Sequence, residues 1–256
     1  MTNKQKKYIE MCRELFSSLF FPKRCPVCDE ILEPEETQRG IHSACESKLY
    51  PILGTVCMHC GRPIGDDNHV NTKEYCQDCL NKAYDKRSFI VQAKSLYVYK
   101  GAIKKSMYRF KYSNKREYGE YFAKYAVERY GWWMKKIGID VIVPVPMYKR
   151  KRKRRGYNQA EVFADQLARY TEIKVDKKMI SRVRDTLPQK QLTSEKRRNN
   201  LKNAFQMRES VVQYNCAMVV DDIYTTGSTA EAVAQQLIKQ GIHRVYLMTV
   251  CIGGDV

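Results

Sequence analysis

The sequence predicts an α/β protein in which a parallel sheet is flanked by helices and preceded by a small zinc-binding module. Three observations predict this class: strand and helix periodicity alternate from Phe89 onward, paired cysteines are confined to residues 25–79, and a polar loop joins an apolar strand to a helix near Asp222. We expect an N-terminal amphipathic helix over residues 1–21, a zinc module over residues 22–85 and the α/β domain over residues 86–256.

The composition is that of a folded and strongly basic chain. Hydrophobic residues make up 43% of the 256 residues, which is enough to bury a core. No apolar run approaches the roughly 18 residues that span a bilayer, so we expect a cytoplasmic protein without a transmembrane segment, at most peripheral to the inner face of the membrane. Lysine and arginine total 46 against 28 acidic residues, and the formal charge of +18 favours polyanionic partners: nucleic acid, an anionic membrane surface or phosphorylated metabolites.

The elements of the α/β domain follow one another in alternation. We expect strands over residues 89–99, 141–146, 216–220 and 243–252, and helices over residues 101–110, 116–136, 158–170 and 229–240. Because strand and helix alternate, a parallel, doubly wound sheet is the expected arrangement.

Eight potential metal ligands occur in four pairs, and two residues separate the members of each pair. The pairs are Cys25 and Cys28, His42 and Cys45, Cys57 and Cys60, and Cys76 and Cys79. This spacing lets both members reach one tetrahedral zinc at about 2.3 Å, and four paired ligands leave no open position, which indicates a structural metal. We expect two zinc ions, one for each successive set of four ligands, with a single zinc or metal-free cysteines as alternatives; His59 is interpreted as a bystander. Retained thiolates favour a reducing compartment.

The sharpest motif lies where the strand over residues 216–220 leads into the helix over residues 229–240. Asp221 and Asp222 stand at the carboxyl end of the strand, where two carboxylates can accept hydrogen bonds from adjacent sugar hydroxyls. The loop that follows offers amides and hydroxyls at a helix N-terminus, which is an anion site, and it consists of Thr225, Thr226, Gly227, Ser228 and Thr229. Gly227 allows close approach of the backbone to a phosphate. An ordinary strand–turn–helix junction is the alternative.

Seven consecutive cations form a second motif. They are Lys149, Arg150, Lys151, Arg152, Lys153, Arg154 and Arg155. Their mutual repulsion predicts a solvated, mobile loop that binds the phosphate of a small ligand or of a DNA backbone, and a plain solvated loop is the alternative. Tyr157 flanks the run, and Tyr108 and Tyr112 lie among cations upstream. Aromatic rings interleaved with cations are typical of single-strand binding.

The aspartate pair and its loop resemble the diphosphoribose-binding motif of the type I phosphoribosyltransferases. The resemblance implies that 5-phosphoribosyl-1-pyrophosphate (PRPP) is the ligand, with Asp221 and Asp222 on its ribose and residues 225–229 on its 5-phosphate. It also implies that the diphosphate, with Mg²⁺, faces the loop after Pro146. Thr225 stands where purine-type members carry an aspartate proposed as general base, so purine salvage is not expected. Orotate-type members also carry threonine there, which leaves catalysis open, and the sequence assigns no catalytic residue.

Further segments are similar to the ComF family of competence proteins. They are Phe110–Tyr112, Arg155–Gln159, Gln189–Leu192, Arg197, Asn200, Ala204–Phe205 and the double cysteine module. This resemblance implies a role in natural transformation, in moving incoming single-stranded DNA into the cytoplasm with a helicase-like ATPase as partner. We therefore expect an accessory protein that binds single-stranded DNA and PRPP. The alternatives are an active phosphoribosyltransferase acting on a base or related acceptor, and a scaffold that docks the ATPase and retains a vestigial pocket.

Overall fold

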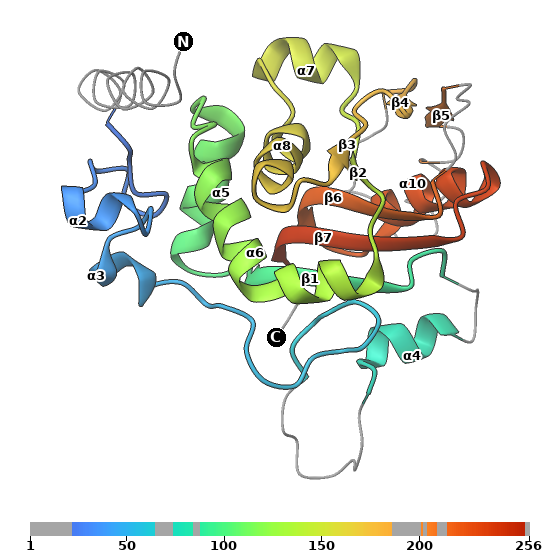
Figure 1. The fold of residues 1–256 in the computed structure, drawn as a ribbon, viewed down its shortest axis with the longest axis horizontal. Helices are drawn as coiled ribbons and strands as arrows, with labels where there is room; N and C mark the ends of the chain where they lie inside the picture. The colour runs from blue at the N-terminus through green and yellow to red at the C-terminus, as the bar shows by residue number, and fades with distance from the viewer. Residues whose placement is uncertain are drawn as a thin grey trace, which may run out of the picture.

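A parallel five-stranded sheet forms the centre of the molecule (Figure 1). The computed structural model describes residues 22–64, 74–83, 88–185, 201, 204–208 and 214–253. The strands of the sheet are β1 (Gln92–Val98), β2 (Val141–Pro144), β3 (Lys174–Val175), β6 (Cys216–Tyr224) and β7 (Arg244–Ile252). Their spatial order is β1-β7-β6-β2-β3, and all neighbours run parallel. The predicted α/β class is confirmed.

Helices cover both faces of this sheet. The helices of the α/β part are α5 (Ala102–Tyr112), α6 (Tyr118–Ile137), α7 (Lys149–Arg155), α8 (Gln159–Thr171) and α10 (Ser228–Lys239). Along β6, Cys216, Met218 and Val220 join a core with residues of α5, α6 and α8, whereas Ala217 and Val219 join a core with residues of α10. This alternation is expected of a strand that is buried on both faces. Within the described ranges, no helix is both long enough and apolar enough to cross a membrane.

The predicted elements are present with shifted boundaries. β6 continues to Tyr224, so Asp221 and Asp222 belong to the strand itself. Three short strands were not predicted: β3, and the antiparallel pair β4 (Ile180–Arg182) and β5 (Phe205–Met207), of which β5 contacts α10. Each is too short to carry a readable periodicity.

The prediction of a mobile loop over residues 149–155 is wrong, because these residues form α7. Lysine and arginine are good helix formers, and Gly156, with φ of 86°, ends the helix in the left-handed conformation. The expected helix over residues 1–21 and the family segments between residues 189 and 200 lie outside the described residues.

The first half of the N-terminal region, with α2 (Pro34–Thr37) and α3 (Ser43–Glu46), packs against α5 and α6. Arg109 donates to the carbonyl of Val27 at 2.9 Å. Tyr118 and Lys115 both contact a carboxylate oxygen of Asp29, each at 2.7 Å. The N-terminal region thus shares a core with the α/β part, and the division between residues 85 and 86 stays a prediction.

The second half, with α4 (Gln77–Ala83), covers the edge of the sheet at β1. The amide of Ile52 donates to the carbonyl of Leu96 at 2.9 Å, and the amide of Ala93 donates to the carbonyl of His59 at 2.7 Å. An uncovered edge strand is a template for aggregation. The N-terminal region therefore supplies hydrogen-bond partners along the outer edge of β1.

Gly61 marks the closest approach of this cover to the sheet. Its φ is +72°, and a Cβ there would lie 2.6 Å from the carbonyl oxygen of Ala93. We expect Gly61→Ala to lower the free energy of unfolding by about 2–4 kcal/mol, because left-handed strain adds to a backbone clash. Denaturant unfolding measures the loss.

Gly54 provides the matched control for this variant. Its φ is +71°, but nothing lies within 4 Å of the position of a Cβ. Gly54→Ala should therefore cost only the conformational strain, about 1 kcal/mol. Equal losses in the two variants would contradict the close approach at Gly61.

Candidate phosphate site and zinc clusters

The predicted zinc ligands come together in two separate groups. In each group the ligand atoms lie within 4.8 Å of one another, and the groups are Cys25, Cys28, His42 and Cys45, and Cys57, Cys60, Cys76 and Cys79. None of these cysteines forms a disulfide. Sulfur and imidazole donors in fours fit tetrahedral zinc and leave no position for a substrate. The protein therefore has structural zinc sites.

His42 is oriented to use Nδ1 as a ligand atom. Its Nδ1 lies 3.2 Å from Sγ of Cys28, while Nε2 lies 3.0 Å from the carbonyl oxygen of Ile31, which requires a donor. This contact leaves the lone pair of Nδ1 for a metal. Burial, and then the neighbouring thiols of Cys25 and Cys28, raise the pKa of Cys45 to about 12. A divalent cation between the sulfurs reverses this effect.

His59 lies outside the four ligands of the second group, as predicted, but it contacts one of them, Cys79. Its Nδ1 is 3.4 Å from Sγ of Cys79, and its Nε2 is 3.1 Å from the carbonyl oxygen of Ile90. His59 thus links a ligand to the chain that leads into β1.

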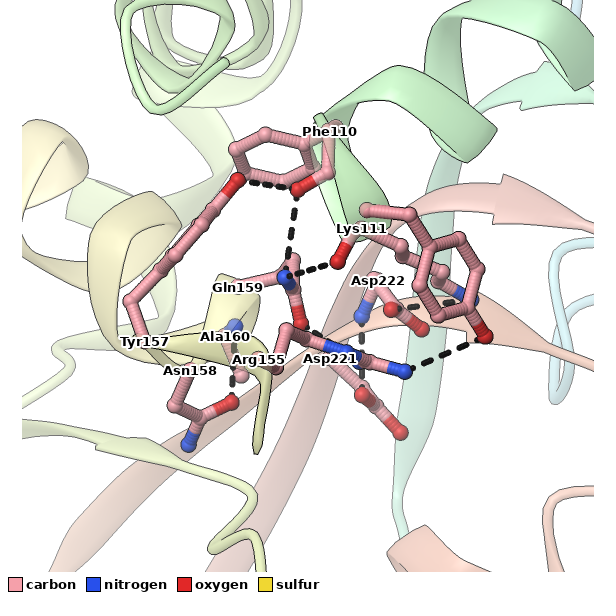
Figure 2. A network of polar contacts seen from close by, with 10 residues as sticks. Phe110, Lys111, Arg155, Tyr157, Asn158, Gln159, Ala160, Asp221 and Asp222 are labelled. Atoms are coloured by element: carbon pink, nitrogen blue, oxygen red, sulfur yellow. Dashed lines mark hydrogen bonds and ion pairs between the residues drawn. The ribbon is translucent and has the colours of Figure 1, made fainter. Parts of the chain in front are cut away.

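Strand β6 places Asp221 and Asp222 at the carboxyl edge of the sheet (Figure 2). Asp222 pairs with Nζ of Lys111 at 3.0 Å, and the two side chains are only 17% and 20% exposed. The carboxylate of Asp221 accepts a hydrogen bond from the amide of Asp222 at 2.8 Å. The charge of the Arg182 guanidinium also acts on Asp221, so the two carboxylates lie near two cations, Lys111 and Arg182.

Burial and the closeness of the two carboxylates determine the pKa values of the site. Burial, and next the charge of Asp222, raise the pKa of Asp221 to about 7. Burial lowers the pKa of Lys111, but its attraction to Asp222 outweighs that effect and the net shift is upward. Sequence reasoning missed Lys111 as a site residue, although its position in the segment Phe110–Tyr112 was a signal.

The five predicted loop residues follow directly after β6. Gly227, with φ of 77°, caps α10, and the hydroxyls of Thr226 and Ser228 lie 2.9 Å apart. An open cavity is lined by Asp221, Thr225, Gly227, Ser228 and Thr229, among others. A Cβ on Gly227 would lie 2.6 Å from the hydroxyl of Tyr224, so packing also requires glycine here.

A short segment before α8 fixes the last turn of α5, which carries Lys111. The hydroxyl of Tyr157 and the amide of Gln159 both donate to the carbonyl of Phe110, the latter at 3.1 Å (Figure 2). Arg155 in turn donates to Oε1 of Gln159 at 2.7 Å. The segment therefore positions the partner of Asp222.

The expectation that Tyr157 contacts diphosphate or DNA is wrong. Its side chain is only 5% exposed, and the guanidinium of Arg116 lies 4.6 Å from the centre of its ring. Its hydroxyl is already a donor to the carbonyl of Phe110. Tyr157 is a structural residue of the site.

The seven cations of α7 differ in their surroundings. Arg152 makes two hydrogen bonds of 2.8 Å to Glu161, and Lys151 pairs with Asp185 at 2.9 Å. Four cations are exposed and form no salt bridge within the described ranges: Lys149, Arg150, Lys153 and Arg154. The hydrogen bond from Lys151, helped by the charge of Arg150, lowers the pKa of Asp185, whereas Lys149, Lys153 and Arg154 are available to an external anion.

Comparison with known proteins places this arrangement in a family. A family model described as "Double zinc ribbon domain" matches residues 16–80. Competence protein F of Haemophilus influenzae is 30% identical over 236 residues, which cover 88% of this chain and 95% of that protein. DNA utilization protein YhgH of Escherichia coli K12 is 30% identical over 215 residues, or 83% of this chain and 90% of the relative. Competence protein ComFC of Bacillus subtilis is 26% identical over 239 residues, with coverages of 85% and 89%.

Similarity at this level over nearly the whole length defines a family of competence and DNA-utilization proteins. The chain belongs to the ComF family. Among solved structures, an adenine phosphoribosyltransferase covers 53% of this chain and 71% of its own, with 15% identity and a TM-score of 0.34.

We expect Asp221→Asn to raise the free energy of unfolding above neutral pH. The folded pKa of Asp221 is raised from 3.8 to about 7, so ionisation of this group costs stability as the pH rises between those values. The gain from asparagine should be absent near pH 4, grow through this window and level off above about pH 7, where it reaches at least about 1 kcal/mol. Denaturant titrations at a series of pH values measure it.

Asp165→Asn serves as the control, because Asp165 is an exposed carboxylate paired with Lys177. This substitution should change the free energy of unfolding by no more than about 0.5 kcal/mol at every pH. A gain for Asp221→Asn that does not vary with pH would contradict a charge origin.

Proposed function

We propose that this protein binds PRPP at Asp221, Asp222 and the loop over residues 225–229, and single-stranded DNA at α7, during uptake of DNA into the cytoplasm. The observation that carries the proposal is the open cavity that is lined by Asp221 and by the loop at the N-terminus of α10. Support for the DNA part comes from the family, whose members include proteins named for competence and DNA utilization.

The site offers a complementary group for each part of a phosphoribosyl ligand. The first amides and hydroxyls of α10 suit the 5-phosphate, because a helix N-terminus attracts anions. The carboxylates of Asp221 and Asp222, only one of which is paired with Lys111, suit the ribose hydroxyls. Carboxylate oxygens also fit Mg²⁺, which would accompany the diphosphate.

Helix α7 suits the backbone of single-stranded DNA. Its exposed cations, Lys149, Arg150, Lys153 and Arg154, lack salt-bridge partners in the part of the chain that the structure describes. Arg155, at the end of the same helix, reaches Tyr112 on α5, so α7 lies next to the turn that carries Lys111.

A helicase-like ATPase, as partner in the cytoplasm, is the third part of the proposal.

Thr225 bears on the choice between binding alone and transfer to a purine. It is exposed and offers no carboxylate to act as general base, which disfavours a purine as acceptor. Release of diphosphate from PRPP with any acceptor would change this assignment to a phosphoribosyltransferase.

We expect PRPP with Mg²⁺ to raise the melting temperature of the wild type by about 5–10 °C at a concentration near 100 times Kd. Asp221→Asn should lose most of this shift while remaining folded. Inorganic diphosphate with Mg²⁺, which has no ribose, should give a smaller shift. Differential scanning fluorimetry measures all three, and the absence of a wild-type shift at millimolar PRPP would refute the ligand.

We expect the triple variant K149Q/K153Q/R154Q to weaken binding of oligo-dT by about 10-fold or more at low salt and to flatten its salt dependence, because phosphate contacts release counterions. Fluorescence anisotropy at several salt concentrations measures both effects. The control K48Q/K135Q/K239Q removes the same charge from exposed lysines outside α7. If the two triple variants behave alike, net charge and not α7 governs DNA binding.

A further inference from the structure

Two tyrosines stand exposed on the surface of α5. Tyr108 and Tyr112 lie one helical turn apart, and they are 62% and 59% exposed. Their ring centres are 5.0 Å apart, and the ring planes are inclined by 48°. The opposite face of the helix is buried through Ile103, Met107 and Phe110. The pair therefore has no part in the core.

The surroundings of the pair are cationic. Helix α5 contains no acidic residue, and its Lys104 and Lys105 are exposed on the turn before Tyr108. The guanidinium of Arg155 lies 4.8 Å from the centre of the Tyr112 ring and donates to its hydroxyl at 3.3 Å. Exposed rings among cations favour an occupant that is both planar and anionic.

The pair is also held in a fixed position next to the candidate ligand site. Lys111, which precedes Tyr112, pairs with Asp222 at 3.0 Å. The carbonyl of Phe110 is fixed by Tyr157, between α7 and α8, and by Gln159, the first residue of α8 (Figure 2). Because the helical turn that carries the rings is already ordered, binding of a partner costs little conformational entropy.

We infer that Tyr108 and Tyr112 form a stacking platform for an unpaired base of single-stranded DNA. This inference rests on the proposed function and assigns a second part of the DNA site: the exposed cations of α7 hold the backbone, and the rings hold a base. Arg155 connects the two parts, because it ends α7 and contacts Tyr112. Stacking on aromatic rings tolerates any base, as expected for incoming DNA of arbitrary sequence.

Two oligonucleotides of equal length test this inference: oligo-dT, and an abasic strand with the same number of phosphates. Stacking of one or two bases predicts that the wild type binds oligo-dT about 10-fold or more tighter than the abasic strand. Tyr108→Ser with Tyr112→Ser should abolish this preference and leave the affinity for the abasic strand unchanged. Tyr108→Phe with Tyr112→Phe keeps the rings and should keep the preference. Fluorescence anisotropy at one fixed salt concentration measures each Kd.

The outcomes separate the platform from the proposed function. Equal wild-type affinity for both strands would overturn the platform and leave DNA binding at α7 intact. An equal loss of affinity for both strands in the serine variant would also overturn it, because the rings would then act by positioning Arg155. If the wild type binds neither strand, the proposed DNA function itself fails, and the platform fails with it.

Discussion

Two hydrogen bonds to one carbonyl oxygen, that of Phe110, fix the position of the helical turn that carries the candidate site residues of α5. The last four carbonyls of a helix have no partner within the helix, and this one is satisfied by Tyr157 and Gln159 from the start of α8. Loss of both donors would leave a buried acceptor unsatisfied, at a cost of about 1–3 kcal/mol. Because the same turn carries Lys111 and Tyr112, these two hydrogen bonds determine the geometry of the carboxylate site and of the tyrosine pair together.

The zinc clusters stabilise the sheet as well as the segments that carry the zinc ligands. The short segments that carry the zinc ligands cannot build a core of their own, and metal bonds replace that core. Once fixed, the second cluster contributes Cys57, Cys60 and Cys79 to the core beneath α10 and covers the edge of β1. The amide of Phe89 then bonds Glu231 of α10 at 3.0 Å. The zinc region is thereby connected to the helix whose N-terminus forms the anion loop.

Local spacing predicted much of the fold, and long-range contacts account for what it missed. The cysteine pairs and the sequence from β6 to α10 are local patterns, and the structure brings each of them together. The seven consecutive cations show no hydrophobic periodicity, because every position is charged. The sequence therefore predicted a loop where the structure has helix α7. The role of Tyr157 was missed because its partner is 47 residues away in the sequence. Lys111 was missed for the same reason, since its pairing with Asp222 exists only after α5 packs against the sheet.

The site contains buried carboxylates although the chain as a whole is strongly basic. The protein carries a formal charge of +18, and the end of β6 places Asp221 and Asp222 side by side, with Lys111 paired to Asp222 and the charge of Arg182 acting on Asp221. Burying such a pair is unfavourable for folding, and the raised pKa of Asp221 is the direct expression of that cost. Groups retained at a cost to stability are typical of binding sites, where a ligand relieves that cost. Hydroxyls or a cation of the ligand would take the carboxylate end, and its phosphates would take the loop and the cations around it. The raised pKa of Asp221 therefore marks the end of β6 as a place where a bound donor or cation would stabilise the folded protein.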